Sequence, residues 1–348
     1  MPLQPSSAPQ QPLQLASRWL RRNLFSNWWN SLLTIVCLWV LYRLGAGFWL
    51  WLTTKAQWTV VMQNWRLFLV GRYPVNQSWR LWLVLAIVLG MTVFWIWGSL
   101  TKRTARRDWF NRLAWGLYPL AFGLCLWLIG GGWGLVKVDT SLWNGLLLTL
   151  LAAIISIVLA FPLGVLLALG RQSALPVLRW FCTAYIELIR GLPLIGILFM
   201  AQVMLPLILP GQIRWDRVVR AIAGLVLFNA AYLAENVRGG LQAIPRGQVE
   251  AAKALGLSIP KTLILIVLPQ AIRVVIPAIV GQFISLFKDT SLLALFALLE
   301  LTGMARSILA QPQFLGRYAE VYLFVGVIYW LFCYAMSQLS RRLERQRG

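Results

Sequence analysis

The sequence contains no histidine. This absence excludes Ser-His-Asp and Cys-His nucleophilic sites, HExxH zinc sites and haem held by an axial histidine. Cysteine is also sparse, because Cys37, Cys125, Cys182 and Cys333 lie far apart and form no CxxC pair. All four fall in apolar segments or at their edges, where a free cysteine usually acts as a small hydrophobic side chain. We therefore expect no catalytic site, no metal site and no disulfide framework.

Acidic residues are scarce as well. Asp and Glu number 10 against 32 Lys and Arg, which gives a formal net charge of +22, while 59% of residues are hydrophobic and only 12% are charged. A soluble domain with about half the usual share of charge would expose large apolar patches. The composition therefore predicts an integral membrane protein. Its basic residues are then expected to hold loops on the cytoplasmic side and to contact anionic lipid, not nucleic acid.

Long apolar segments predict the architecture, because a membrane helix needs about 20 mainly apolar residues. The sequence favours an all-α, polytopic protein with about eight transmembrane helices, at 31–52, 81–100, 115–135, 142–169, 192–209, 218–237, 263–285 and 319–338. The apolar run 290–301 is too short to span and is expected to be a half-helix or re-entrant piece. Residues 1–30 are predicted to be a cytoplasmic tail that begins with a disordered, Pro- and Gln-rich stretch and is not a cleaved signal peptide.

The distribution of basic residues predicts the orientation. With the N-terminus inside, cytoplasmic segments carry 19 Lys and Arg, and external segments carry 10. Basic residues favour the cytoplasmic side, so both termini are expected there. The external loop 53–80 holds four of the basic residues, so the first two helices fit this rule least well.

Composition also changes along the chain near Asp139, after a run of three glycines. Before this point lie about three Trp-rich helices, whose indoles are expected at the two membrane interfaces. After it lie most of the acidic residues. We therefore expect an N-terminal extension over 31–140 and the working core over 141–348.

Four charged residues lie where a membrane helix makes charge costly. Glu187 and Arg190 are three residues apart, and Glu235 and Arg238 repeat this spacing. An intrahelical ion pair at the cytoplasmic edge explains each case. The alternative is a polar lining of a substrate path, because ionisable residues within membrane segments mark such paths.

Two further features bear on this path. A continuous helix over 178–209 would be about 48 Å long, too long for the hydrocarbon core, so we expect Gly191 and Pro193 to break it. Lys288 and Asp289 follow the span 263–285. They are either a solvated turn before a capped helix or a polar element at the external mouth of the path.

The polar segment 238–262 is too hydrophilic to span and is expected to form one short cytoplasmic helix between Pro245 and Pro260. In such a helix Ala252 and Gly256 would share a small-residue face that can pack into a groove on another protein. A surface helix without contacts is the alternative.

The same segment contains a longer pattern, in which seven fixed residues stand at set spacings: Glu250, Ala251, Ala252, Gly256, Ile266, Leu268 and Pro269. This pattern matches the EAA motif of the membrane subunits of bacterial ABC importers. The stretches TAYIELIRGLPLI, NAAYLAENVRGGL, LPQAIRVVIP and LFKDTSL resemble the permeases of polar amino-acid uptake. The resemblance covers about 141–340, and the added helices make the chain look most like the longer permease of general or neutral L-amino-acid transporters.

The resemblance implies a permease core of about five helices in the bacterial inner membrane, importing L-amino acids. Its partners would be a second permease, two cytoplasmic ATPases and a periplasmic binding protein. Glu250, Ala251, Ala252, Gly256, Leu268 and Pro269 would couple to the ATPase. ATP would be used by that partner, because this chain has no GxxxxGK[ST] phosphate loop and needs no cofactor of its own.

A zwitterionic substrate needs a basic group for its carboxylate and an acidic group or carbonyls for its ammonium. The candidates nearest a path are Glu187, Arg190, Glu235, Lys288 and Asp289. An ion channel, a permease for another solute and a membrane enzyme remain alternative functions. The residues do not specify which amino acids are carried, whether this subunit holds its own substrate site, or what residues 1–140 do.

Overall fold

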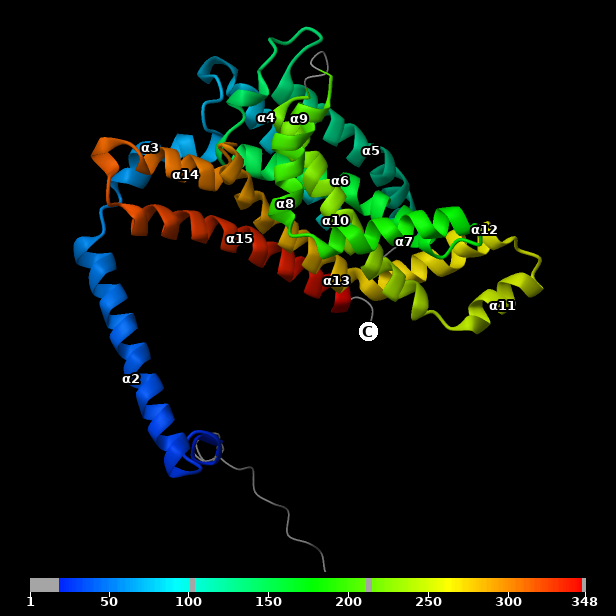
Figure 1. Cartoon of the computed structure of the whole chain (residues 1–348), viewed down its shortest axis with the longest axis horizontal. Coiled ribbons are helices and arrows are strands. Elements are labelled where there is room, and N and C mark those ends of the chain that lie inside the picture. The colour runs from blue at the N-terminus through cyan, green and yellow to red at the C-terminus, as the bar shows by residue number, and fades with distance from the viewer. Residues whose placement is uncertain (1–18, 101–103, 211–214, 346–348) are drawn as a thin grey trace, which may run out of the picture. The chain divides into compact units, whose positions relative to one another are not determined.

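The structure is a computed structural model that describes residues 19–100, 104–210 and 215–345. The disordered stretch expected at the start of the N-terminal tail lies mostly outside these ranges. The described chain is helical almost throughout, which confirms the all-α prediction (Figure 1). Its α-helices are α2 (Trp28–Leu50), α3 (Thr59–Val70), α4 (Trp79–Leu100), α5 (Thr104–Gly130), α6 (Gly145–Arg171), α7 (Pro176–Gly191), α8 (Leu194–Phe199), α9 (Leu205–Ile208), α10 (Arg217–Gln242), α11 (Arg246–Ala254), α12 (Ile259–Thr262), α13 (Leu268–Asp289), α14 (Leu301–Leu309) and α15 (Tyr318–Arg345).

Shorter helical segments join some of these elements. A π-helical turn, η4 (Met200–Met204), connects α8 to α9, and a second, η5 (Leu263–Val267), connects α12 to α13. Among the described residues, seven helices are long and apolar enough to cross a membrane, or up to eight if a bent helix pair forms one span. The expectation of about eight spans is therefore confirmed.

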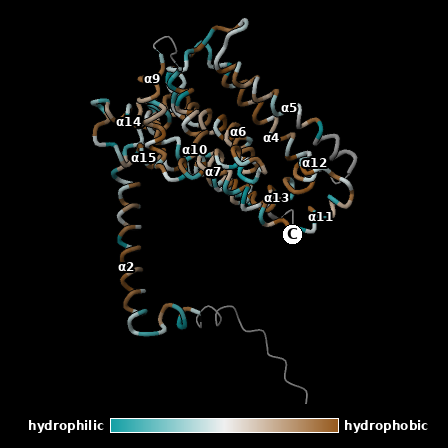
Figure 2. The backbone as a smooth tube through the Cα atoms, turned by 45° about the vertical axis from the view of Figure 1, so that its right-hand side comes forward, coloured by the Kyte–Doolittle hydropathy of each residue, from teal (hydrophilic) through white to brown (hydrophobic). Residues whose placement is uncertain are grey.

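The chain divides into two compact units, residues 1–58 and residues 59–348. In the first unit, α2 has no buried residue, and hydrophobic residues occupy most of its length (Figure 2). A helix that is apolar all round is suited to a hydrocarbon environment, because it has no face that favours water. The composition of α2 therefore fits a helix surrounded by lipid or by other membrane helices.

The second unit has its core where α6, α10 and α13 pack together. Glycines allow these helices to approach closely, as small residues do between membrane helices. A Cβ atom on Gly164 would lie 2.7 Å from the Cβ of Leu233, and one on Gly240 would lie 2.5 Å from the carbonyl oxygen of Ala271. Larger side chains at either glycine would separate the helices.

The second unit has two ends. We call the end where α10 runs into α11 the loop end, and the end where α3 and α14 lie the opposite end (Figure 1). At the opposite end α3 packs against α6, α14 and α15. By packing, α3 therefore belongs with the permease-like core, although it precedes residue 140. The expected division near that residue stays a prediction about the organisation of the chain.

Two glycines lock α3 against the start of α6. Gly71 and Gly145 both have positive φ angles, of 58° and 63°, which other residues rarely adopt. A Cβ atom on Gly71 would lie 2.2 Å from the Cβ of Asn144, and one on Gly145 would lie 2.5 Å from the carbonyl oxygen of Phe68. The contact therefore needs glycine for both backbone conformation and space.

The run 290–301, which was expected to be a half-helix or a re-entrant piece, does not form one continuous helix. It begins as a 3₁₀ helix, η6 (Thr290–Phe296), which ends at Ala297 with a left-handed φ of 54°. Glu300 then caps α14, accepting hydrogen bonds from the backbone N–H groups of Thr302 and Gly303 at 2.8 Å each. Burial raises the pKa of the Glu300 carboxyl to about 7, and these N–H bonds act against the rise.

Candidate functional site

The candidate site lies at the loop end, where α6 ends and α7 and α10 pass each other. Pro176 stands in the first turn of α7, where its missing N–H costs no helical hydrogen bond. The helix ends at Gly191, and α7 and the following segment α8–α9 meet at an angle of 104°. The predicted break at Gly191 and Pro193 is therefore confirmed. It turns α7 across the end of the bundle and brings the polar residues of α7 to α10.

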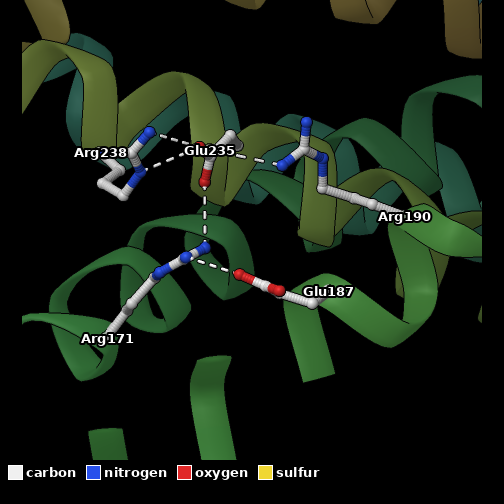
Figure 3. A network of polar contacts seen from close by, with 5 residues as sticks. All are labelled: Arg171, Glu187, Arg190, Glu235 and Arg238. Carbon is white, nitrogen blue, oxygen red and sulfur yellow. Dashed lines mark hydrogen bonds and ion pairs between the residues drawn. The ribbon is translucent and has the colours of Figure 1, made fainter. Parts of the chain in front are cut away.

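Five charged side chains converge there (Figure 3). The Glu235 carboxylate on α10 accepts a hydrogen bond from Nη1 of Arg171 at 3.3 Å and from Nε of Arg238 at 2.9 Å. It also lies 3.8 Å from Nη1 of Arg190. Arg171 donates through its other terminal nitrogen to Glu187 at 2.8 Å. Glu235 is thus the carboxylate with which arginines from α6, α7 and α10 form ion pairs.

Exposure differs across this network. The Glu235 side chain is only 21% exposed, whereas Arg190 is 39% and Glu187 is 62% exposed. Arg190 also stacks over the ring of Tyr232, with its guanidinium carbon 5.5 Å from the ring centre. Of the network residues, Glu187 and Arg190 are therefore the more accessible to a solute, while Glu235 is enclosed by its partners.

Only one of the two predicted intrahelical ion pairs forms as the spacing suggests. Glu235 pairs with Arg238, three residues later. Glu187, by contrast, pairs with Arg171, and Arg190 pairs with Glu235. The reason is tertiary, because Glu187 and Arg190 lie next to residues of other helices, Arg171 on α6 and Glu235 on α10.

Arg171 was not among the candidates from the sequence, because it follows the expected span 142–169. It is the last residue of α6 and bridges two carboxylates that lie 16 and 64 residues further along the chain. A basic residue that ends an apolar span was the available signal. That signal places Arg171 at the membrane edge but does not identify the carboxylates with which it pairs.

Lys288 and Asp289 do not join this network. They end α13, and α13 runs from the loop end to the opposite end. The neighbouring Thr290 side chain donates to the carbonyl oxygen of Phe287 at 2.7 Å and does not cap a following helix. The sequence candidates for a substrate path thus lie at two separate ends of the bundle.

The segment after α10 forms α11, which is shorter than expected. It ends at Ala254, and Gly256 follows it with a φ of 76°. The N–H of Gly256 donates to the carbonyl of Lys253 at 2.9 Å, and the N–H of Leu257 donates to the carbonyl of Ala252 at 3.1 Å. These two bonds form a Schellman motif, which ends a helix at a left-handed glycine.

The prediction that Ala252 and Gly256 share one face of a helix is therefore wrong, because Gly256 lies beyond the end of α11. Ala252 is buried, with 1% of its surface exposed, and α11 as a whole packs against α12 and η5. Glu250 and Ala251 are exposed. Leu268 and Pro269 form the first turn of α13, where proline is tolerated.

Comparisons with known proteins agree with this arrangement. Residues 160–347 match the family model "Binding-protein-dependent transport system inner membrane component". The chain is 41% identical to the inner membrane amino-acid ABC transporter permease protein YhdY of Escherichia coli (strain K12), over 94% of this chain and 92% of that protein. It is 34% identical to the glutamate/glutamine/aspartate/asparagine transport system permease protein BztC of Rhodobacter capsulatus, over 95% of this chain and 93% of that protein.

Shorter proteins match only part of the chain. The probable glutamine ABC transporter permease protein GlnP of Bacillus subtilis is 41% identical over 58% of this chain and 92% of its own length. A crystal structure of an amino acid ABC transporter with histidines also covers 58% of this chain and 92% of its own, with 28% identity and a TM-score of 0.52. The remaining part of the chain is shared with the long relatives.

Proposed function

Because the chain belongs to the family of binding-protein-dependent transport system inner membrane components, we propose that it imports L-amino acids as one of two permease subunits in an ATP-driven complex. It is the multi-pass, non-catalytic inner-membrane permease of an amino-acid ABC transporter. The proposal adds its partners: a second, homologous permease, two cytoplasmic ATPases and a periplasmic amino-acid-binding protein. The substrates proposed are neutral amino acids or a broad range. The match to amino-acid permeases along nearly the whole chain carries the proposal.

The proposed coupling surface is α11 with its exposed residues Glu250 and Ala251. Ala252 supports this surface from beneath, because it is buried against the permease itself. Gly256 ends the helix through its left-handed backbone and so sets the length of the element that would enter the ATPase. Leu268 and Pro269 would act at the point where the coupling loop, residues 238–262 with the turn that follows, joins α13.

The proposed substrate path runs between the two ends of the second unit. At the loop end, the accessible pair Glu187 and Arg190 offers a carboxylate and a guanidinium to the two charges of an amino acid. At the opposite end, Lys288 and Asp289 offer a second pair of charges. Glu235 accepts bonds from two arginines and lies close to a third, which supports a structural role in the path and not a direct contact with substrate.

The orientation proposed places the loop end and both termini in the cytoplasm. The helix α15 begins beside α14 at the opposite end and runs toward the loop end (Figure 1). The described end of α15, at Arg345, is then on the same side as α11. This placement agrees with the larger number of basic residues in the segments assigned to the cytoplasm.

The test is uptake of radiolabelled L-amino acids by cells that lack the gene and by cells in which it is restored. We expect several neutral amino acids to enter more slowly in the deletion strain and normally after restoration. An affinity tag on the permease should copurify an ATPase and a second permease. Normal uptake of every amino acid by the deletion strain, assayed in a background without other amino-acid importers, would refute the proposed substrate class.

A further inference from the structure

Glu235 joins three helix ends through one carboxylate. Arg171 is the last residue of α6, Arg190 belongs to the last turn of α7, and Arg238 lies one turn further along α10 (Figure 3). The oxygen Oε2 accepts from Arg171, and Oε1 accepts from Arg238 and faces Arg190. With 21% of its side chain exposed, Glu235 is partly shielded from water, and a network of this kind is held more firmly than an isolated surface pair.

This network lies close to the start of the coupling loop. The loop was expected to begin at Arg238, but this residue belongs to α10, which ends four residues later at Gln242, just before α11. Arg171 lies at the point where the chain leaves α6 for α7, and α7 leads through the break at Pro193 into α8. The end of α10, from which the loop starts, is therefore linked by ion pairs to α6 and α7, the two helices that precede α8.

We propose that Glu235 and Arg171 are positioning residues for transport, which make the root of the coupling loop move together with α6 and α7. Arg171 is central because its two terminal nitrogens bind carboxylates on different helices, Glu187 on α7 and Glu235 on α10. A displacement of α11 then carries α7 and the bend before α8 with it. Without the link, the loop can move while the bent span stays in place.

The contacts in the network differ in length. The Arg190–Glu235 contact, at 3.8 Å, is the longest, whereas Arg171 lies 2.8 Å from Glu187 and 3.3 Å from Glu235. Arg171 is therefore the closer of the two links that join Glu235 to other helices.

The inference rests on the proposed function, and its test uses the complete transporter in proteoliposomes with its binding protein and ATP. Amino-acid uptake and ATP hydrolysis are measured in the same sample, and the ratio of the two is compared between variants. Glu235→Gln and Arg171→Gln remove the link, while Arg171→Lys retains a charge. Arg179→Gln is the matched control, because Arg179 lies on α7 at the same end and bonds the carbonyl oxygen of Ser173.

We expect the uptake-to-hydrolysis ratio to fall at least about fivefold in Glu235→Gln and Arg171→Gln, a size typical of coupling between sites. Arg171→Lys should recover part of the ratio, and Arg179→Gln should not change it. A purely structural role would lower the amount of assembled transporter without changing the ratio. An unchanged ratio in assembled Glu235→Gln and Arg171→Gln would overturn the inference.

A variant that does not assemble and an unmodified transporter that takes up no amino acid are interpreted differently. If Glu235→Gln does not assemble, Arg171→Gln decides the test, because it removes the link from the other side, and an unchanged ratio in that variant would overturn the inference. If the unmodified transporter takes up none of the amino acids tested, the proposed function is refuted and this inference falls with it. Uptake by the unmodified transporter thus reports on the function, and the ratio reports on the network.

Discussion

Replacing Glu300 with alanine should destabilise the opposite end of the second unit. The Glu300 side chain is fully buried and accepts hydrogen bonds from the N–H groups of Thr302 and Gly303 and, at 3.1 Å, from the hydroxyl of Tyr329. Alanine would leave these three donors without their acceptor, at about 1–3 kcal/mol for each one that stays shielded from water. We therefore expect the free energy of unfolding to fall by about 3 kcal/mol or more.

The same carboxyl gives the stability a pH dependence of known sign. Burial raises its pKa from an ordinary 4.5 to about 7, so the folded chain binds the proton more tightly than the unfolded chain. The stabilisation from protonating Glu300 is therefore complete below about pH 4.5 and is lost as the pH rises through about 7. The unmodified chain should gain stability between pH 8 and pH 5, and Glu300→Gln should lack this part of the gain.

The assay is thermal unfolding of the detergent-purified transporter, followed by the reaction of buried Cys182 with a thiol-reactive fluorophore. Arg306→Ala is the matched control, because Arg306 lies on the same helix, α14, and is exposed. We expect Glu300→Ala to lower the midpoint by several degrees at pH 8 and Arg306→Ala to leave it nearly unchanged. Equal midpoints for the two variants would show that the three donors do not depend on Glu300.

Two further predictions concern glycines with matched controls. The Gly256→Val protein should insert in the membrane but no longer copurify the ATPase, because valine does not tolerate a φ of 76° at the end of α11. The control is Gly247→Ala, on the exposed side of α11, which should copurify the ATPase normally. Gly240→Ala should cost about 1–3 kcal/mol of stability, because its Cβ atom would lie 2.5 Å from the carbonyl oxygen of Ala271, while Gly239→Ala meets open space and should be neutral or slightly stabilising in the same thermal assay.

Much of the fold could be predicted from the sequence because a bilayer imposes simple rules. Apolar length fixed the spans, and the excess length of 178–209 required the break that the structure has at Gly191 and Pro193. Helix ends that depend on backbone dihedral angles could not be predicted as well. The helix after α10 stops at Ala254 because Gly256 adopts a left-handed conformation, and spacing alone cannot distinguish a glycine inside a helix from one that ends it.

Contacts that could not be predicted from the sequence depend on tertiary packing. Glu300 lies in an apolar run and gave no sign of its partners, because Tyr329 and Thr149 come from α15 and α6. The same holds for α3, which lies in a segment expected to be a plain external loop. Its attachment relies on two positive-φ glycines, Gly71 and Gly145, whose partners are backbone atoms distant in sequence.

The network at the loop end shows why charges at a membrane edge pair between helices. A carboxylate that is partly removed from water gains from each additional donor, and three helix ends at one place can supply more donors to Glu235 than its own helix can. The network contains three arginines. Basic residues near the ends of membrane helices favour the cytoplasmic side. The pairing pattern and the count of basic residues therefore support the same orientation, and that orientation places the Glu235 network on the side where ATP is available.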